Sequence, residues 1–493
     1  MRLFDRRRGW TPAVLGLSVV VLVAAGIAAV NGRTPAPVLQ LETAPVYSPP
    51  PPPEMGVVLD AGEPADLTHA VTAPIPAPPS APRPPGNLTS STGVPLKPRA
   101  IVLPATTSTQ RATKAPAGSG KASTLTAITV SRSATGELGD GTSWQPSLSA
   151  DGRFVAYTSD ATNLVVGDTN GLQDVFVHDL VSRVTVRASV GSDGEQADGS
   201  STWPSISGDG SLVAFQSPAA SLGAIGGELA VFLHDMHSGT TTLVAQAAMT
   251  PQISNDGRWL LWNDKRTGDA VLLDRQTGDA DSLPAGAARN RSGRLTGDGR
   301  HFVFCSSAAV TDSTEAGYFE IYVYDVDTGR FDLLSKPVAG DANLQSFDPS
   351  ASDDGSTAVF SSNRRLTPDD TDDWMDTFVR DRTKVATTMA PRNDSARYSV
   401  REQAISGDGR MVAIGIASAD SNDPRNDVFA WERTTGHITR LLTTGGTPIT
   451  AASARGFDWS TDGRTLAASG TGLGFSDDEP THKNSQIVIW RSP

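Results

Sequence analysis

The sequence predicts an all-β fold for residues 124–493, and three observations lead to this prediction. A phrase of one apolar residue, Ser or Thr, a one-residue spacer, Asp-Gly and a short apolar run recurs seven times. Its mean spacing is about 52 residues, which is typical of propeller blades or of solenoid units. Helical periodicity is absent, whereas short runs rich in Val, Phe and Thr alternate with turn residues. The seven pairs begin at Asp151, Asp209, Asp256, Asp298, Asp354, Asp408 and Asp462.

Each unit is predicted to contain four strands, and unit 1 shows them most clearly. Asp151-Gly152 separates the first two strands and predicts a tight type I′ hairpin turn. Residues 154–157 are apolar without alternation, as expected for a strand that is buried on both faces. The third and fourth strands are predicted at residues 175–179 and 184–187.

The two ends of the array predict that the units close into a ring. Unit 7 supplies only three strands, the last at residues 487–490. Residues 126–131 precede unit 1 and are followed by Gly136-Glu137, just as the fourth strand of unit 1 is followed by Gly194-Glu195. This segment is therefore a fourth strand by position, and we expect it to pair with residues 487–490. The result is a seven-bladed β-propeller closed by an N-terminal strand, with no long sheet edge left open.

The repeats resemble the WD40-like PD40 repeat of TolB-type seven-bladed β-propellers. The resemblance covers residues 124–493 and rests on the phrase Pro-x-apolar-Ser-x-Asp-Gly, as at residues 146–152, followed by a strand that ends in Asp, as at residues 175–179. It implies the fold and an exported or envelope setting. It implies no single activity, because such propellers serve as binding platforms or as gates beside a hydrolase domain.

The N-terminal 33 residues predict a membrane anchor. Arg2, Arg6, Arg7 and Arg8 precede an apolar stretch at residues 11–30, which is long enough to cross a bilayer core as one helix. The positive-inside rule then keeps the N-terminus cytoplasmic and places the rest of the chain outside the membrane. A cleavable signal peptide is the alternative interpretation, since residues 26–28 are small.

Residues 34–123 predict a flexible linker between the anchor and the propeller. Twenty of the 34 prolines lie between residues 34 and 120, including a run at residues 49–53. Proline cannot donate to a helix or to a sheet ladder, so this region is expected to form a disordered, partly extended spacer.

Charge and cysteine content exclude several classes of function. Residues 124–493 carry 30 Lys/Arg and 48 Asp/Glu, and a body this acidic argues against nucleic-acid binding. Cys305 is the only cysteine, which excludes a disulfide framework and Cys-ligated metal clusters. It lies in an apolar run and is expected to be a packed core thiol.

Two loops between the second and third strands carry the pattern Asp-x-Asp/Asn-x-x-x-Asp. Hard oxygen ligands on alternate residues suit Ca²⁺, whereas the alternative is that the side chains only stabilise turns. The candidate ligands are Asp168, Asn170 and Asp174 in unit 1, and Asp370, Asp372 and Asp376 in unit 5. No cofactor other than Ca²⁺ and no catalytic residue is predicted.

The sequence therefore predicts a single-pass protein of the cell membrane whose extracytoplasmic propeller is a binding scaffold. Its ligand is an unidentified protein or peptide of the envelope, held at the mouth of the central channel or on a loop rim. The alternative is a propeller enzyme of the metal-dependent lactonase or lyase type. That alternative requires several carboxylates or histidines that converge on the central axis.

Overall fold

The computed structural model describes residues 126–283, 293–308, 310–311, 317–337, 345–391, 398–418, 426–441, 455–470 and 484–492. All of them belong to the compact unit Arg111–Pro493. The predicted anchor at residues 11–30 and the predicted linker at 34–123 lie outside the described ranges. Within those ranges, no helix combines the length and apolar character that a membrane crossing requires.

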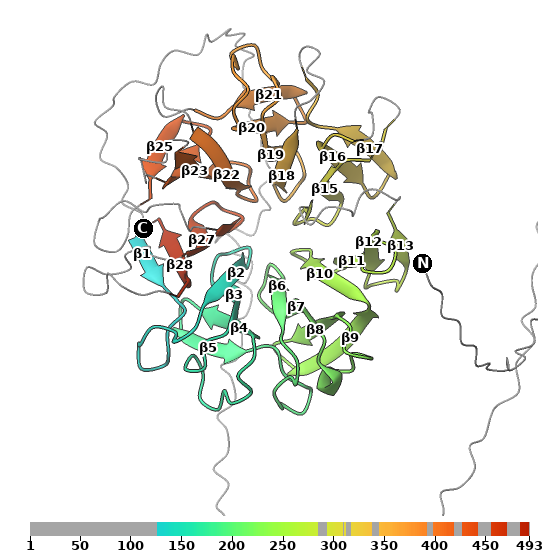
Figure 1. Cartoon of the computed structure of the whole chain (residues 1–493), viewed down its shortest axis with the longest axis vertical. Helices are drawn as coiled ribbons and strands as arrows, with labels where there is room; N and C mark the ends of the chain where they lie inside the picture. The colour runs from blue at the N-terminus through green and yellow to red at the C-terminus, as the bar shows by residue number, and fades with distance from the viewer. Residues whose placement is uncertain are drawn as a thin grey trace, which may run out of the picture. The chain divides into compact units, whose positions relative to one another are not determined.

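The described residues form seven four-stranded antiparallel sheets, which we number as blades 1–7 in chain order (Figure 1). Blades 1 to 3 are β2 (Ser143–Leu148), β3 (Phe154–Ser159), β4 (Asp174–Asp179), β5 (Val184–Arg187); β6 (Thr202–Ile206), β7 (Leu212–Ser217), β8 (Ala230–Asp235), β9 (Thr240–Gln246); and β10 (Ala248–Ile253), β11 (Trp259–Asp264), β12 (Ala270–Asp274), β13 (Ala280–Ser282). Blades 4 and 5 are β14 (Gly293–Leu295), β15 (His301–Ser306), β16 (Glu320–Asp325), β17 (Arg330–Leu333); and β18 (Ser346–Ala351), β19 (Thr357–Ser362), β20 (Asp376–Asp381), β21 (Ala386–Met389). Blades 6 and 7 are β22 (Tyr398–Ile405), β23 (Met411–Ser418), β24 (Asn426–Glu432), β25 (His437–Arg440); and β26 (Arg455–Trp459), β27 (Thr465–Gly470), β28 (Gln486–Arg491), β1 (Thr126–Thr129). One 3₁₀ turn, η1 (Ala220–Leu222), follows β7.

Strand β1 closes the ring, as the sequence predicts. It pairs antiparallel with β28, and the paired residues include Ile128 with Ile489 and Thr129 with Val488. The chain therefore brings its first described strand next to its last one (Figure 1). Just beyond β1, the Ser131 hydroxyl donates to the Gln486 side chain at 2.5 Å and accepts from the Ile487 amide at 3.0 Å.

The hydrophobic core lies between neighbouring blades. Every residue of β19 is buried, which fits an apolar run without alternation. One core cluster joins Val155 and Tyr157 of blade 1 to Ile487 and Ile489 of blade 7. Cys305 is buried and packs in the cluster between blades 4 and 5, so its predicted core position is confirmed.

The Asp-Gly turns are not type I′ turns, which corrects the prediction from the sequence. In blade 1 only Gly152 has a positive φ, of 65°, whereas a type I′ turn requires positive φ at both central positions. Asp151 instead uses its carboxylate as a cap. The Ser149 hydroxyl and the Arg153 amide both donate to it, at 2.7 and 2.9 Å. The repeated Ser-x-Asp-Gly phrase is therefore a side-chain hydrogen-bond network, with glycine supplying one left-handed residue.

The seven turns are joined to one another by backbone hydrogen bonds of 2.7–2.9 Å that run around the whole propeller. We call this set of residues the turn ring: Ala150, Gly208, Asn255, Gly297, Asp298, Asp353, Gly407, Asp408 and Thr461. The Asp353 carboxylate accepts hydrogen bonds from Asn255 of blade 3 and Thr461 of blade 7. A Cβ atom at Gly297 or Gly407 would collide with the same carboxylate. The glycines therefore leave room for Asp353 to link blades that are not neighbours.

Candidate functional site

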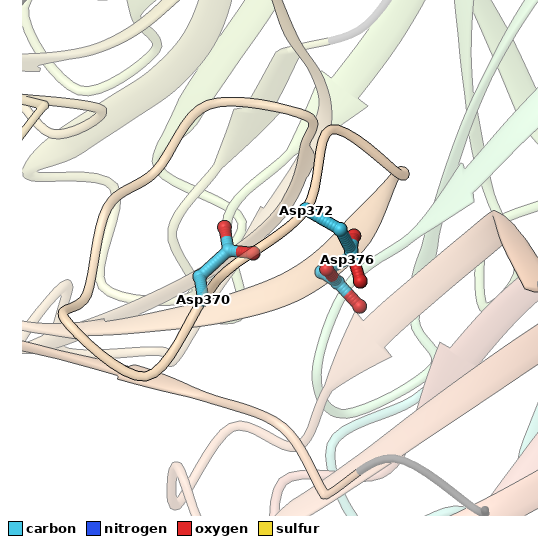
Figure 2. Close-up of side chains that lie close together, drawn as sticks. All are labelled: Asp370, Asp372 and Asp376. Carbon is cyan, nitrogen blue, oxygen red and sulfur yellow. The ribbon is translucent and has the colours of Figure 1, made fainter. Parts of the chain in front are cut away.

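The acidic loop of blade 5 brings its three predicted ligands together. It connects β19 to β20, and Figure 2 shows Asp370 on one side of the loop, with Asp372 and Asp376 on the other. One carboxylate oxygen from each residue lies within 4.8 Å of the other two. Asp370 and Asp376 are buried, and Asp372 is partly exposed while its carboxylate accepts a hydrogen bond from the Trp374 amide at 3.0 Å. Three converging carboxylates are a donor set that a hard divalent cation can use.

The matching loop of blade 1 is organised around an arginine. Arg187 Nη2 lies 3.5 Å from Asp168 Oδ1, and Arg187 Nη1 lies 3.6 Å from Asp174 Oδ2. Asn170 points its amide group at Asp174, because Asn170 Nδ2 donates to Asp174 Oδ2 at 3.0 Å. Burial raises the pKa of Asp168 and of Asp174, and the Arg187 charge opposes this. A guanidinium group thus supplies the positive charge here, and Asn170 acts as a donor.

The register of the fourth strand distinguishes the two loops. Arg187 pairs with Phe176 in blade 1, and the equivalent pair in blade 5 is Met389 with Phe378. The hydroxyl of Ser189, which donates to Asp174 at 2.6 Å, corresponds to Pro391 two residues after Met389. Blade 5 therefore has the acidic loop, but it lacks the arginine that pairs with the loop carboxylates in blade 1 and the serine that donates a hydrogen bond to one of them.

In blade 4 the arginine that pairs with the buried acid comes from the neighbouring blade 5. Glu320 begins β16 at the position that Asp174 has in β4, and it is buried. Arg364 Nη2, from the loop after β19, lies 2.9 Å from Glu320 Oε1, and the Ser335 hydroxyl donates to Glu320 at 2.5 Å. An acid at the start of the third strand is thus paired with arginine in blades 1 and 4.

A second acidic group lies at the centre of the propeller and was not found from the sequence. Figure 1 shows the first strands of the blades, among them β2, β6, β18 and β22, nearest the common centre. Because both faces of a blade pack against neighbours, an exposed side chain on a first strand faces the common axis. Among the first-strand residues whose burial is described, three are exposed: Trp203 on β6, Arg294 on β14 and Asp348 on β18. Trp203 and Asp348 lie six residues before the Asp of their turns, and Arg294 lies four residues before it.

Four carboxyl groups of this central region have raised pKa values. They belong to Asp348, Asp353, Glu402 and Asp458, and burial is the largest cause in each. The group also interacts internally, since the Asp348 charge raises the pKa of Glu402 and the Asp353 charge raises that of Asp458. The pKa of Asp348 is raised although the residue is exposed, because the surrounding protein displaces much of the bulk water that would stabilise its charged form.

The positive charge of Arg294 stabilises the ionised form of two of these carboxyl groups. Its charge lowers the pKa of both Glu402 and Asp458, partly offsetting their burial. Glu402 also accepts the Gly456 amide at 2.6 Å, and Asp458 accepts the Leu148 amide at 2.7 Å, so both carboxylates link one blade to the next. Together with Trp203 and Asp348, these three residues form what we call the axial site.

The axial site could have been found by aligning the seven units on their turns. Six residues before the turn Asp stand Gln145, Trp203, Thr250, Ser292, Asp348, Glu402 and Gly456; four residues before it stand Ser147, Ser205, Gln252, Arg294, Ser350, Ala404 and Asp458. Charged and aromatic side chains at these two positions are the signal. Ser292 lies outside the described residues.

Comparisons with known proteins return similar folds. No family model matches the chain, and no curated protein matches it. Among solved structures, the oligogalacturonate lyase of Vibrio parahaemolyticus is 13% identical with a TM-score of 0.48, over 75% of this chain and 97% of that one. The propeller domain of the trilobed protease of Pyrococcus furiosus, which has an open velcro topology, is 14% identical with a TM-score of 0.46, over 72% and 94%. The putative TolB of Agrobacterium tumefaciens is 17% identical with a TM-score of 0.34, over 72% and 91%.

These likenesses concern the fold alone, because every identity is below 20%. The chain is a seven-bladed β-propeller that is closed by its own N-terminal strand.

Proposed function

We propose that this protein is a membrane-anchored, extracytoplasmic binding scaffold whose ligand site is the axial site. The observation that carries the proposal is the exposed carboxylate of Asp348 on β18, with an exposed tryptophan on the opposite strand β6 and with Glu402 and Asp458, whose pKa values burial raises, on β22 and β26. Ionisable groups whose pKa values are shifted by burial cluster at binding and catalytic sites. The Arg cluster and the apolar residues 11–30 support the anchor and the outward orientation.

The enzyme alternative is less well supported than the scaffold. A metal-dependent lyase or lactonase requires at least three protein ligands that converge on one ion. Among the described residues, the group of His, Cys, Asp or Glu side chains with that convergence is in the blade 5 loop. The axial carboxylates do not form such a group. The residues at the axis therefore favour binding over metal-assisted chemistry.

The location and the binding function can be tested together. Protease added to intact, wall-stripped cells is expected to digest the propeller, because the body lies outside the membrane. Full protection would overturn the orientation, and a soluble form that starts near Asn31 would favour the signal-peptide alternative. The same propeller, used as bait on solubilised envelope, is expected to retain a protein that it loses after Asp348→Asn. A partner retained equally by both baits would exclude the axial site as its binding surface.

We also propose that the acidic loop of blade 5 holds a Ca²⁺ ion that stabilises it. Binding to the native state alone raises stability by about 2.7 kcal/mol at 100 times Kd. The melting temperature is therefore expected to rise with calcium and to fall with a chelator. Asp372→Asn should remove this response, because asparagine keeps the hydrogen bond from Trp374 but loses the charge.

The matched control for calcium is Asp168→Asn in blade 1. Arg187 already neutralises that loop, so this variant is expected to be less stable but to keep the full calcium shift. An unchanged melting temperature of the parent protein in calcium, or a shift that survives Asp372→Asn, would contradict the calcium site.

A further inference from the structure

We infer that the axial site binds an organic cation, that is, an alkylammonium or guanidinium group; this rests on the proposed binding function and specifies its ligand. The first observation is the state of Asp348. Its carboxylate is exposed at the axis and makes no hydrogen bond or ion pair with any residue that the structure describes. The other carboxylates have partners: Asn255 and Thr461 donate to Asp353, and backbone amides donate to Glu402 and Asp458.

A second, independent observation comes from Gln403, which is 5% exposed. Its Nε2 donates to the backbone oxygen of Asp348, so the side chain lies beside that residue. Its Oε1 is buried and has no hydrogen-bond partner among the described residues. A buried acceptor that lacks a donor is unfavourable. Gln403 therefore lies against the backbone of Asp348 with one acceptor unsatisfied among the described residues, and the exposed acceptor of the site is the Asp348 carboxylate.

Trp203 supplies the apolar part of the site. It is 39% exposed, although tryptophan is a residue that folding normally covers. With seven blades in chain order around one axis, blade 2 faces blades 5 and 6, and Figure 1 shows β6 and β18 on opposite sides of the centre. The face of an indole ring attracts ammonium and guanidinium groups, because its π electrons carry partial negative charge.

The same residues exclude the other simple ligands. An anion would meet four carboxyl groups and one arginine. A metal ion needs ligand atoms that converge within a few ångströms, and the described axial acids do not converge in this way. A donor-rich, weakly hydrated organic cation needs only one free carboxylate and an aromatic face.

The turn ring limits the direction of entry. It joins all seven turns at one end of the first strands, and Asp353 spans that end between blades 3, 5 and 7. A ligand therefore reaches Asp348 from the opposite end, where the loops between second and third strands lie. A free amine and a lysine or arginine side chain of an envelope protein are both compatible with this geometry.

The test is calorimetric titration of the full-length protein in detergent, with three probes. Spermidine represents a free amine, the peptide acetyl-Gly-Lys-Gly-amide represents a protein side chain, and calcium represents a metal ion. At least one of the first two is expected to bind. Asp348→Asn is expected to weaken that binding about tenfold or more, because it removes a charged hydrogen bond. Trp203→Leu should weaken it about three- to tenfold.

The control and the pH dependence separate this site from surface charge. Glu195→Gln removes an exposed acid of blade 1 and is expected to leave binding unchanged. Affinity should rise with pH through a range above the ordinary carboxyl pKa, because Asp348 and Glu402 must ionise and burial raises the pKa of each.

Two outcomes would overturn the inference: no binding of either cationic probe to the folded protein, or binding that Asp348→Asn leaves intact. If neither probe binds while the envelope bait still depends on Asp348, the ligand class is wrong and the proposed function stands. If the bait is also indifferent to Asp348, the proposed function fails with it.

Discussion

Removal of residues 1–133 is expected to destabilise the propeller by roughly 5 kcal/mol, whereas removal of residues 1–118 should leave it stable. The longer deletion removes β1, which covers the outer edge of blade 7. It also removes Val130, which is 2% exposed and packs in the core, and Ser131, whose hydroxyl bonds Gln486 and Ile487. A buried Val contributes about 1.5–3 kcal/mol and each hydrogen bond about 1 kcal/mol.

Thermal melts and light scattering of the two truncated proteins measure this difference. The shorter deletion is the control, because it removes only the predicted anchor and most of the linker. The longer one should melt earlier and aggregate, since β28 then presents an unpaired edge. Equal melting temperatures and equal solubility would mean that β1 does not hold the ring closed.

Arg187→Met is expected to cost about 3–5 kcal/mol at neutral pH, because it leaves two buried carboxylates without their cation. Asp168 and Asp174 are almost fully buried at 3.5 and 3.6 Å from the guanidinium. Burial already raises the pKa of both. Without Arg187 the folded-state pKa values rise further, so the penalty is present above them and disappears as pH falls and the carboxylates protonate in the native state.

Urea unfolding at pH 7 and at pH 5 measures this effect. Arg266→Met is the matched control: it breaks the pair with Asp264, but Arg266 is 68% exposed, and such pairs are worth 0–1 kcal/mol. A loss at pH 7 no larger than that of the control, or one that grows toward pH 5, would contradict the role of Arg187. Because methionine is the residue that blade 5 carries at this position, the variant should also add a calcium response in blade 1.

The repeat pattern was sufficient to predict the blades and their closure, because both follow from local signals. Residues 126–131 were assigned to the last blade from the phrase that follows them, and the observed register with β28 agrees. The prediction of type I′ turns is wrong because it rests on the backbone preference of Asp-Gly alone. In the structure, Asp151 caps the turn with its side chain and keeps a negative φ, so the preceding serine is the informative residue.

The candidate sites were predicted less well, because they depend on contacts between distant residues. The loop pattern identified Asp370, Asp372 and Asp376, which do meet, but it could not show that Arg187 lies beside the matching loop of blade 1. The axial site combines residues from five blades that are separated by up to 255 positions. Each is unremarkable within its own unit, and the ring closure brings them together.

The closed ring positions every site described above, and one cross-link tests it most directly. Thr129→Cys and Val488→Cys, in a chain that also carries Cys305→Ala, replace directly opposed residues of β1 and β28. This pair is expected to form a disulfide, because opposed residues without mutual hydrogen bonds have Cα atoms about 4.5 Å apart. The pair Thr129→Cys with Ile489→Cys places the thiols on opposite faces of the sheet and should not. Efficient cross-linking of the first pair alone is the predicted result. No cross-linking, or equal cross-linking of both pairs, would contradict a propeller closed by its N-terminal strand.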